Sequence, residues 1–274
     1  MYVIMLKFFR KQKPPLTVGI QLTATYISVL VLDAKDPKQP QILDYVNYRV
    51  DQYESAEALK EQVKQYIEEK SLKKAYCCLV LDDQDYQLLA VEPPKVPQAE
   101  MAEAVKWKVK DLIQFPITEA VVDVFSQPES HDANREIVDV VVANKSIVDT
   151  KAQFIHDIGL ELVAIDIPEL AYRNYFETCE HQEANVALVL IKQSYGKLVV
   201  INKGNVCFSR SFFVNYGGGL FDDIPENDIV LELQRSLDYY ERQMRLPRLF
   251  LRGIILLKIK SQQSHEKVLI SRLQ

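Results

Sequence analysis

The stretch that most constrains the fold of this chain is Thr17–Asp33, which reads TVGIQLTATYISVLVLD. Apolar residues run along both halves of the stretch, on either side of a short polar connection, which is the pattern of two strands joined as a hairpin. We expect the two strands at Val18–Leu22 and Ile27–Leu32, with Thr23–Tyr26 between them. This hairpin would start the first β-sheet of the protein.

The same order of elements is predicted twice along the chain. After the hairpin come a strand at Gln41–Val50, a helix at Ala56–Glu69 with Ser55 as its N-cap, and a strand at Ala75–Leu81. The second series has strands at Val186–Ile191, Lys197–Asn202 and Val206–Phe213, a helix at Asp228–Arg245 and a strand at Arg248–Leu257. Both series read β-β-β-α-β, so we expect an α/β protein with two domains of one architecture.

A different segment separates the two series. Three prolines within residues 92–97 exclude a helix or a regular strand there. The elements expected after them are a helix at Gln98–Ile113, strands at Val121–Phe125 and Ile137–Ala143, a helix at Lys145–Ile158 closed by Gly159, a strand at Leu162–Ile165 and a helix at Glu169–Phe176. The predicted parts are a basic segment (1–16), a first domain (17–93 and 160–180), an inserted α+β module (94–159), a second domain (184–257) and a C-terminal tail (258–274).

Composition narrows the function classes. The chain has 274 residues and a net charge of −5, which argues against nucleic acid as a partner. No apolar run reaches the roughly 18–20 residues that a membrane-spanning helix needs. The first 16 residues carry Lys7, Arg10, Lys11 and Lys13 and no acidic residue. That segment either lies on an anionic membrane surface or is a frayed start. Neither the cysteines nor the histidines have the spacing of a metal site, so we expect no metal.

Three segments carry a resemblance to a known family. Glu103–Phe125, Val140–Ala171 and Leu231–Gln243 resemble segments of the PilM branch of the actin-like superfamily, which is related to FtsA. The resemblance implies an actin-like (ribonuclease H-like) fold. It also implies a cytoplasmic protein held peripherally at the inner membrane, beside PilN- and PilO-like proteins and a separate pilus assembly ATPase. The 2B-type subdomain, which that family has between a glycine motif and its last helix, is missing here, because only Leu220–Asn227 separates Gly217–Gly219 from the helix.

The nucleotide site that the family carries is degenerate in this sequence. Where the family has the Asp and Gly of its first phosphate loop, this chain has Gln21 and Thr23, and where it has those of the second loop, Leu190 and Lys192. Neither Gln nor Leu supplies the carboxylate that holds magnesium. Asp166 matches the family's acidic residue that faces the nucleotide, although its place before Pro168 also suits a helix start. The remnants of the site are Gly19, Gln21, Thr23, Asp166, Leu190, Lys192, Ser194 and Gly196.

Two functions remain open at this point. The first is a scaffold without catalytic residues or cofactor, which is not an enzyme. The alternative is an ATP-binding actin-like protein that regulates pilus or type II secretion assembly, with Lys192 and Ser194 holding the nucleotide in altered loops.

The inserted module offers the best candidate for a partner site. In PilM the N-terminal cytoplasmic peptide of PilN lies in a groove between the first domain and this module. Trp107 and Phe115 could line such a groove here, since aromatic side chains are common anchors of bound peptides. The other interpretation is that Trp107 packs against the module's own sheet.

Overall fold

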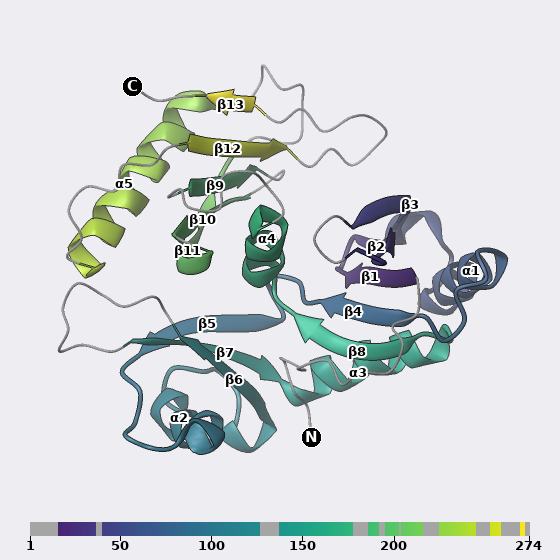
Figure 1. The fold of residues 1–274 in the computed structure, drawn as a ribbon, viewed down its shortest axis with the longest axis horizontal. Coiled ribbons are helices and arrows are strands. Elements are labelled where there is room, and N and C mark those ends of the chain that lie inside the picture. The colour runs from purple at the N-terminus through teal and green to yellow at the C-terminus, as the bar shows by residue number, and fades with distance from the viewer. Residues whose placement is uncertain are drawn as a thin grey trace. The chain divides into compact units, whose positions relative to one another are not determined.

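A computed structural model of the protein describes residues 16–36, 40–126, 137–177, 186–191, 195–202, 204–215, 225–244, 253–258 and 269–271. All of the predicted basic segment except Leu16, and most of the predicted C-terminal tail, lie outside these ranges. The chain divides into two units. The first comprises Met1–Phe125 and Val138–Ala171, and the second comprises Ser126–Ile137 and Tyr172–Gln274. Figure 1 shows the elements of both.

The main sheet of the first unit has five strands in the order β3-β2-β1-β4-β8. The strands β1 (Leu16–Leu22), β2 (Tyr26–Asp33) and β3 (Gln41–Arg49) are antiparallel, whereas β4 (Tyr76–Val80) and β8 (Glu161–Asp166) continue the sheet in parallel. Alternate residues of the hairpin are buried: Val18, Ile20 and Leu22 in β1, and Ile27, Val29 and Val31 in β2. The predicted hairpin is confirmed.

Two helices of the first unit begin at side-chain caps. Helix α1 (Ala56–Glu69) starts where Ser55 Oγ accepts a hydrogen bond from the Ala58 amide at 3.1 Å, and it buries one apolar face. Helix α3 (Lys145–Asp157) starts where Asn144 Oδ1 accepts from the Ser146 amide at 2.8 Å. It contacts β4, β7 and β8. Gly159 follows α3 at φ +86°, the left-handed conformation that suits glycine at a helix end.

A smaller sheet holds three strands in the order β5-β7-β6, namely β5 (Tyr86–Val91), β7 (Val138–Asn144) and β6 (Ala120–Ser126). Its core packs valines of β7 against Val105 and Val109 of α2 (Met101–Val109). Strand β5 was not predicted. It lies before residue 94, which was the predicted start of the module. By its hydrogen bonds β5 is part of the module's sheet, since it pairs antiparallel with β7.

The helix expected at Gln98–Ile113 is shorter in the structure. Its first three residues form a 3₁₀ turn (Gln98–Glu100), and α2 ends at Val109. A helix continued to Ile113 would place Leu112, three residues after Val109, on the core side, but Leu112 is 55% exposed. The physical reason is that Ile113 and Phe115 pack against the valine core, which requires the chain to leave the helical direction before them. Two more 3₁₀ turns occur, at Val50–Gln52 and Ile117–Glu119.

The sheet of the second unit has the order β11-β10-β9-β12-β13. Its strands are β9 (Val186–Ile191), β10 (Tyr195–Asn202), β11 (Asn205–Phe213), β12 (Gly253–Lys258) and β13 (Leu269–Ser271). As β4 does with β1, β12 lies parallel to β9, so the β-β-β-α-β order predicted twice is confirmed. The strand β13 falls within the predicted tail and pairs antiparallel with β12.

Helix α5 (Glu226–Met244) covers the core of this second sheet with Ile229, Leu233, Leu237 and Tyr240. Helical spacing with Leu233 and Leu237 would place Val230 on the buried face, but Val230 is 51% exposed because Ile229, 6% exposed, occupies that face instead. Helix α4 (Pro168–Glu177) follows β8 at the boundary of the two units. Among the helices of the described ranges, none has the length and apolar character needed to cross a bilayer.

Candidate functional site

The end of the β1–β2 hairpin is the point at which the family would bind phosphate, and here a threonine closes it. Thr23 Oγ1 accepts hydrogen bonds from the Thr25 amide at 3.3 Å and the Tyr26 amide at 3.0 Å. The Thr23 amide donates to the Tyr26 carbonyl at 2.9 Å. A phosphate loop binds its anion through free backbone amides. Three amides of this turn are instead satisfied by groups of the turn itself.

Gln21 and Gly19 lie one and two steps back along the same strand. Gln21 Nε2 donates to the Leu81 carbonyl at 3.4 Å, so its side chain links β1 to the end of β4. Gly19 lies opposite Leu30 in β2 and Cys78 in β4. A Cβ atom on Gly19 would come no closer than 3.8 Å to Leu30 Cβ, an ordinary contact. Nothing in the packing of the strand therefore requires a glycine at this position.

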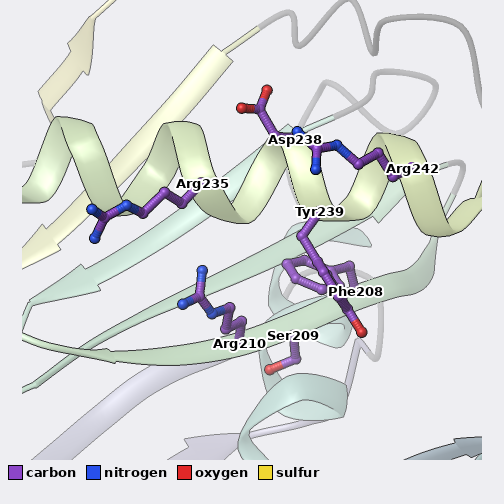
Figure 2. Close-up of a pocket in the computed structure, with 7 residues that line it drawn as sticks. All are labelled: Phe208, Ser209, Arg210, Arg235, Asp238, Tyr239 and Arg242. Carbon is purple, nitrogen blue, oxygen red and sulfur yellow. The ribbon is translucent and has the colours of Figure 1, made fainter.

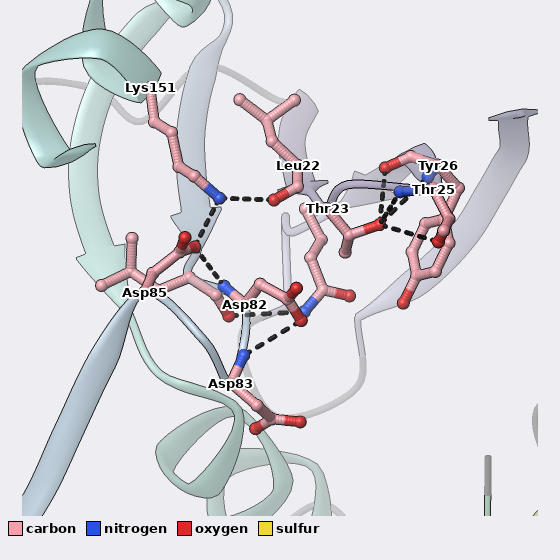
Figure 3. A network of polar contacts seen from close by, with 10 residues as sticks. Leu22, Thr23, Thr25, Tyr26, Asp82, Asp83, Asp85 and Lys151 are labelled. Carbon is pink, nitrogen blue, oxygen red and sulfur yellow. Dashed lines mark hydrogen bonds and ion pairs between the residues drawn. The ribbon is translucent and has the colours of Figure 1, made fainter. Parts of the chain in front are cut away.

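A lysine from a distant helix reaches the hairpin end. Lys151 of α3 donates from Nζ to the Leu22 carbonyl at 2.5 Å and forms an ion pair with Asp85 (Figure 3). Both side chains are largely buried, with 15% of Lys151 and 13% of Asp85 exposed. Asp85 Oδ2 also accepts from the Asp82 amide at 2.7 Å. The chain thus places its own cation at the end of β1, held by α3 and by the turn between β4 and β5.

Carboxylates of the β4–β5 turn also act on a nearby phenol. Burial, together with the negative charges of Asp82 and Asp83, raises the pKa of Tyr26 to about 12. The Tyr26 hydroxyl is therefore protonated at neutral pH.

Asp166 ends β8 and leads into α4. Its Oδ1 accepts from the Ile167 amide at 2.8 Å, and its carbonyl accepts from the Leu81 amide at 2.9 Å. Its charge adds to the effect of burial in raising the pKa of the Cys78 thiol to about 12. In this unit Asp166 lies across from Val80 in the β4–β8 pairing, beside the strand that Gln21 contacts.

The predicted residues of the second loop divide into two groups. Lys192 and Ser194 lie outside the described residues. Leu190 is 2% exposed and pairs with Lys197 across the β9–β10 ladder. Gly196 faces Phe212 of β11, and a Cβ atom there would lie 2.4 Å from two ring atoms. Glycine at this position has a packing reason that is independent of any phosphate.

The two candidate groove residues differ in exposure. Trp107 on α2 is 60% exposed, so it does not fill the valine core of the module. Phe115 is half-buried and packs against that core. Leu112, on the same segment, is 55% exposed. Trp107 and Leu112 are therefore the exposed large apolar side chains of α2 and the turn that follows it.

Sequence reasoning did not identify Lys151 and Asp85. Lys151 lies in an ordinary amphipathic helix, 129 positions from the carbonyl it contacts, and no local pattern distinguishes it. A signal did exist for Asp85, because three aspartates, Asp82, Asp83 and Asp85, directly follow a predicted strand.

Comparison with known proteins gives structural matches alone. No family model matches the sequence, and no curated protein matches it. Among solved structures, the chain is similar to the PilM-PilN type IV pilus biogenesis complex, with 21% identity and a TM-score of 0.68 over 88% of this chain and 81% of that chain. It is also similar to the cytoplasmic domain of EpsL, an inner membrane component of the type II secretion system of Vibrio cholerae. That match has 14% identity and a TM-score of 0.56 over 91% of this chain and 84% of that chain.

A third structure is a protein of unknown function from Bacteroides thetaiotaomicron with an actin-like ATPase fold, at 12% identity and a TM-score of 0.47 over 89% of this chain and 81% of that chain. At 21% and 14% identity, the first two likenesses show a shared fold and nothing finer. The two sheets with their repeated strand order and the structures they match show that this chain has the actin-like fold.

Proposed function

We propose that this chain is a non-catalytic actin-like scaffold of a type IV pilus assembly platform, of the kind found in the mannose-sensitive haemagglutinin (MSHA) system as MshI. It would bind the N-terminal cytoplasmic peptide of a PilN-like inner-membrane protein, and it would stand peripherally at that membrane, near a separate assembly ATPase. The likeness in fold to the protein of the PilM-PilN complex supports the placement among pilus proteins.

One observation carries the non-catalytic part of the proposal. The hairpin end holds a threonine that satisfies the amides of the turn and a lysine that supplies a positive charge from within the chain. A magnesium ion with its nucleotide would need free amides and a carboxylate on β1. Gln21 provides no carboxylate, and the Lys151 ammonium group, paired with Asp85, already occupies the Leu22 carbonyl at the end of β1.

Thermal unfolding with and without MgATP tests this part. A nucleotide bound with a Kd below about 0.1 mM stabilises a fold by more than about 1 kcal/mol at millimolar concentration. For a chain of this size that raises the Tm by roughly 2–4 °C. We expect the Tm to change by less than 1 °C at about 5 mM MgATP. A shift of 3 °C or more would overturn the scaffold and favour the alternative, an ATP-binding regulator of pilus or type II secretion assembly.

Peptide binding tests the partner. A fluorescein-labelled peptide with the sequence of the cytoplasmic tail of the PilN-like partner would be titrated with the full chain, using anisotropy. We expect Trp107→Ala to weaken binding about 10-fold or more, as loss of a central aromatic anchor costs about 2 kcal/mol. Tyr45→Ala is the matched control, since Tyr45 is a 57% exposed aromatic residue on β3 of the same unit. If both variants bound the peptide with equal affinity, Trp107 would not be part of the peptide-binding groove.

A further inference from the structure

A groove in the second unit has no part in the proposed function. It lies between β11 and α5 and measures about 630 Å³. Phe208, Ser209 and Arg210 line it from the strand, while Arg235, Asp238, Tyr239 and Arg242 line it from the helix (Figure 2). Three arginines against one acidic residue make its lining cationic, on a chain whose net charge is −5.

Two of the arginines are held in place by one carboxylate. Glu232 Oε1 accepts from Arg235 at 2.7 Å, and Glu232 Oε2 lies 3.4 Å from Arg210 Nη2. Arg210 Nη1 also donates to Ser236 Oγ at 2.8 Å. A guanidinium carries five N–H donors, so both groups keep donors for a ligand. Glu232 carries one negative charge against the two positive charges of Arg210 and Arg235, so the three groups keep a net charge of +1. Its contacts also hold both guanidinium groups in position.

Arg242 completes the set at a different point of α5. It is exposed, and within the described part of the chain it has no hydrogen bond or ion pair. In a helix, seven residues cover about 10.5 Å, which separates Arg242 from Arg235 by two turns. In Figure 2, Arg210 and Arg235 lie toward one end of the groove, and Arg242 lies further along the helix.

Aromatic rings form the apolar part of the groove. The Phe208 and Tyr239 rings lie 6.0 Å apart at 41°, and Phe208 also contacts Tyr240 at 5.5 Å. Because the rings pack against each other, they leave no slot between them for a flat base. Tyr239 is nevertheless 52% exposed, so it offers a ring face to an apolar side chain.

The spacing of these groups decides between ligand classes. A single phosphate group is bound by donors that converge on one point, whereas these guanidinium groups are spread over about 10 Å. In an extended peptide, three residues cover a similar distance, at about 3.3 Å each. Carboxylates match arginine in two-pronged geometry, and acidic segments are commonly recognised by arginine clusters.

We propose that this groove binds an extended acidic segment of a partner protein. One acidic side chain would lie against Arg210 and Arg235, an apolar side chain against Tyr239, and a second acidic side chain against Arg242. The proposal goes beyond the PilN-like peptide site, which involves α2 of the first unit, and it gives the protein a second surface for a partner of opposite charge.

The probes are fluorescein-labelled ten-residue peptides that carry two aspartates, three or four residues apart, with one phenylalanine between them. Matched peptides replace both aspartates with asparagine. The full chain would be titrated by anisotropy at about 50 mM salt, where charge pairs contribute most. We expect at least one acidic peptide to bind with a Kd below 1 mM and its asparagine form to bind at least fivefold more weakly.

Variants locate the binding. We expect Arg242→Gln to weaken binding of the acidic peptide at least fivefold, while Arg49→Gln, at a half-buried arginine of β3 that pairs with Asp51, leaves its affinity unchanged. Arg242 is exposed and forms no hydrogen bond or ion pair within the described residues, so Arg242→Gln should keep the wild-type Tm. The proposal is overturned if no acidic peptide binds below 1 mM or if Arg242→Gln binds as well as Arg49→Gln. It is also overturned if only inorganic phosphate, ATP or phosphatidylglycerol vesicles bind to the groove.

Discussion

At the scale of single residues, Gly196 has too little space beside it for any side chain. Phe212 lies directly opposite in β11 and is 5% exposed, and Ile191 Cδ1 would lie 3.2 Å from an added Cβ on the other side. A methyl group there meets the ring at 2.4 Å, and the enclosed ring has little room to turn away. The strand pair therefore depends on the absence of one carbon atom.

We predict that Gly196→Ala lowers the free energy of unfolding by about 1–3 kcal/mol, the usual cost of forcing an extra group into a packed core. Urea titration followed by circular dichroism measures it. Gly19→Ala is the control, since its Cβ would have a normal 3.8 Å contact and should cost less than about 0.5 kcal/mol. Adding Phe212→Leu to Gly196→Ala should recover part of the loss. An unchanged stability of Gly196→Ala would contradict the packing argument.

Buried phenols make stability depend on alkaline pH. Burial is the main cause that raises the pKa of both Tyr26 and Tyr48 to about 12. In the unfolded chain these phenols ionise near pH 10. Their contribution to folding is therefore fully present below pH 10 and is lost as the pH rises from about 10 to 12.

We predict that the free energy of unfolding is flat from pH 8 to about 9.5 with respect to these groups and falls above pH 10. Absorbance at 295 nm should show that Tyr26→Phe and Tyr48→Phe each remove a component that titrates near pH 12. Asp82→Asn should lower the pKa of Tyr26 only in part, because burial outweighs the carboxylates. If Tyr26 and Tyr48 titrated near pH 10 in the folded protein, this account of their burial would be wrong.

At the scale of elements, α3 contacts strands of both sheets of the first unit. It begins at the Asn144 cap directly after β7, contacts β4 and β8, and sends Lys151 to the end of β1. Lys60 of α1 also forms an ion pair with Asp157 at the end of α3, at 3.3 Å. One helix thereby joins the small sheet of the module to the main sheet.

We predict that Lys151→Met destabilises the protein by about 2–4 kcal/mol, because it leaves Asp85 buried without its cation. The double variant Lys151→Met/Asp85→Asn should recover at least half of that loss, since asparagine keeps an oxygen for the Asp82 amide and carries no charge. Urea unfolding of the four proteins in this cycle gives the coupling energy. A loss of less than about 0.5 kcal/mol in Lys151→Met would show that the Lys151–Asp85 ion pair does not stabilise the fold.

Local sequence patterns were sufficient to predict most helices and strands. They failed where a segment's position depends on a partner far away in the sequence. Helix α1 and its Ser55 cap could be predicted because helical spacing and capping are local features of the sequence. The buried face of this helix consists of Leu59, Val63, Tyr66 and Ile67. Strand β5 was missed because YQLLAV has weak alternation, and its place depends on β7, about fifty residues later. Of the candidate site, the loss of carboxylates at Gln21 and Leu190 was readable, whereas Lys151 and the arginine groove arise only when separate segments fold together.

At the scale of the whole molecule, the strand order places β3 at one end of the main sheet. Among the described residues β3 pairs with β2 alone, and three of its large apolar side chains are exposed: Ile42 at 68%, Leu43 at 52% and Tyr45 at 57%. The register with β2 shifts between Val31 and Leu32, an irregularity that disrupts regular pairing of another strand there. The apolar edge still favours association when the chain is concentrated.

We predict that Ile42→Lys reduces concentration-dependent light scattering during slow heating and leaves the Tm within about 1 °C. An edge lysine discourages strand-to-strand pairing, and Ile42 contributes little to the core because most of it is exposed. Lys substitution at Val46, a half-buried residue of the same strand, should instead lower the Tm. Equal scattering of Ile42→Lys and the parent protein would exclude this edge as the route of association.

The contact of Lys151 with Asp85 and the Leu22 carbonyl is a joint at the hairpin end, and it also bears on when this part of the protein can change its structure. Lys151, Asp85 and the Leu22 carbonyl are all parts of one polypeptide, so this joint forms once, as the chain folds. A joint made by a bound nucleotide would open and close with every turnover. On the proposed scaffold function, the geometry that links α3, the module and the first sheet would not respond to the ATP level of the cell, and the number of copies made would set how much of this surface is present.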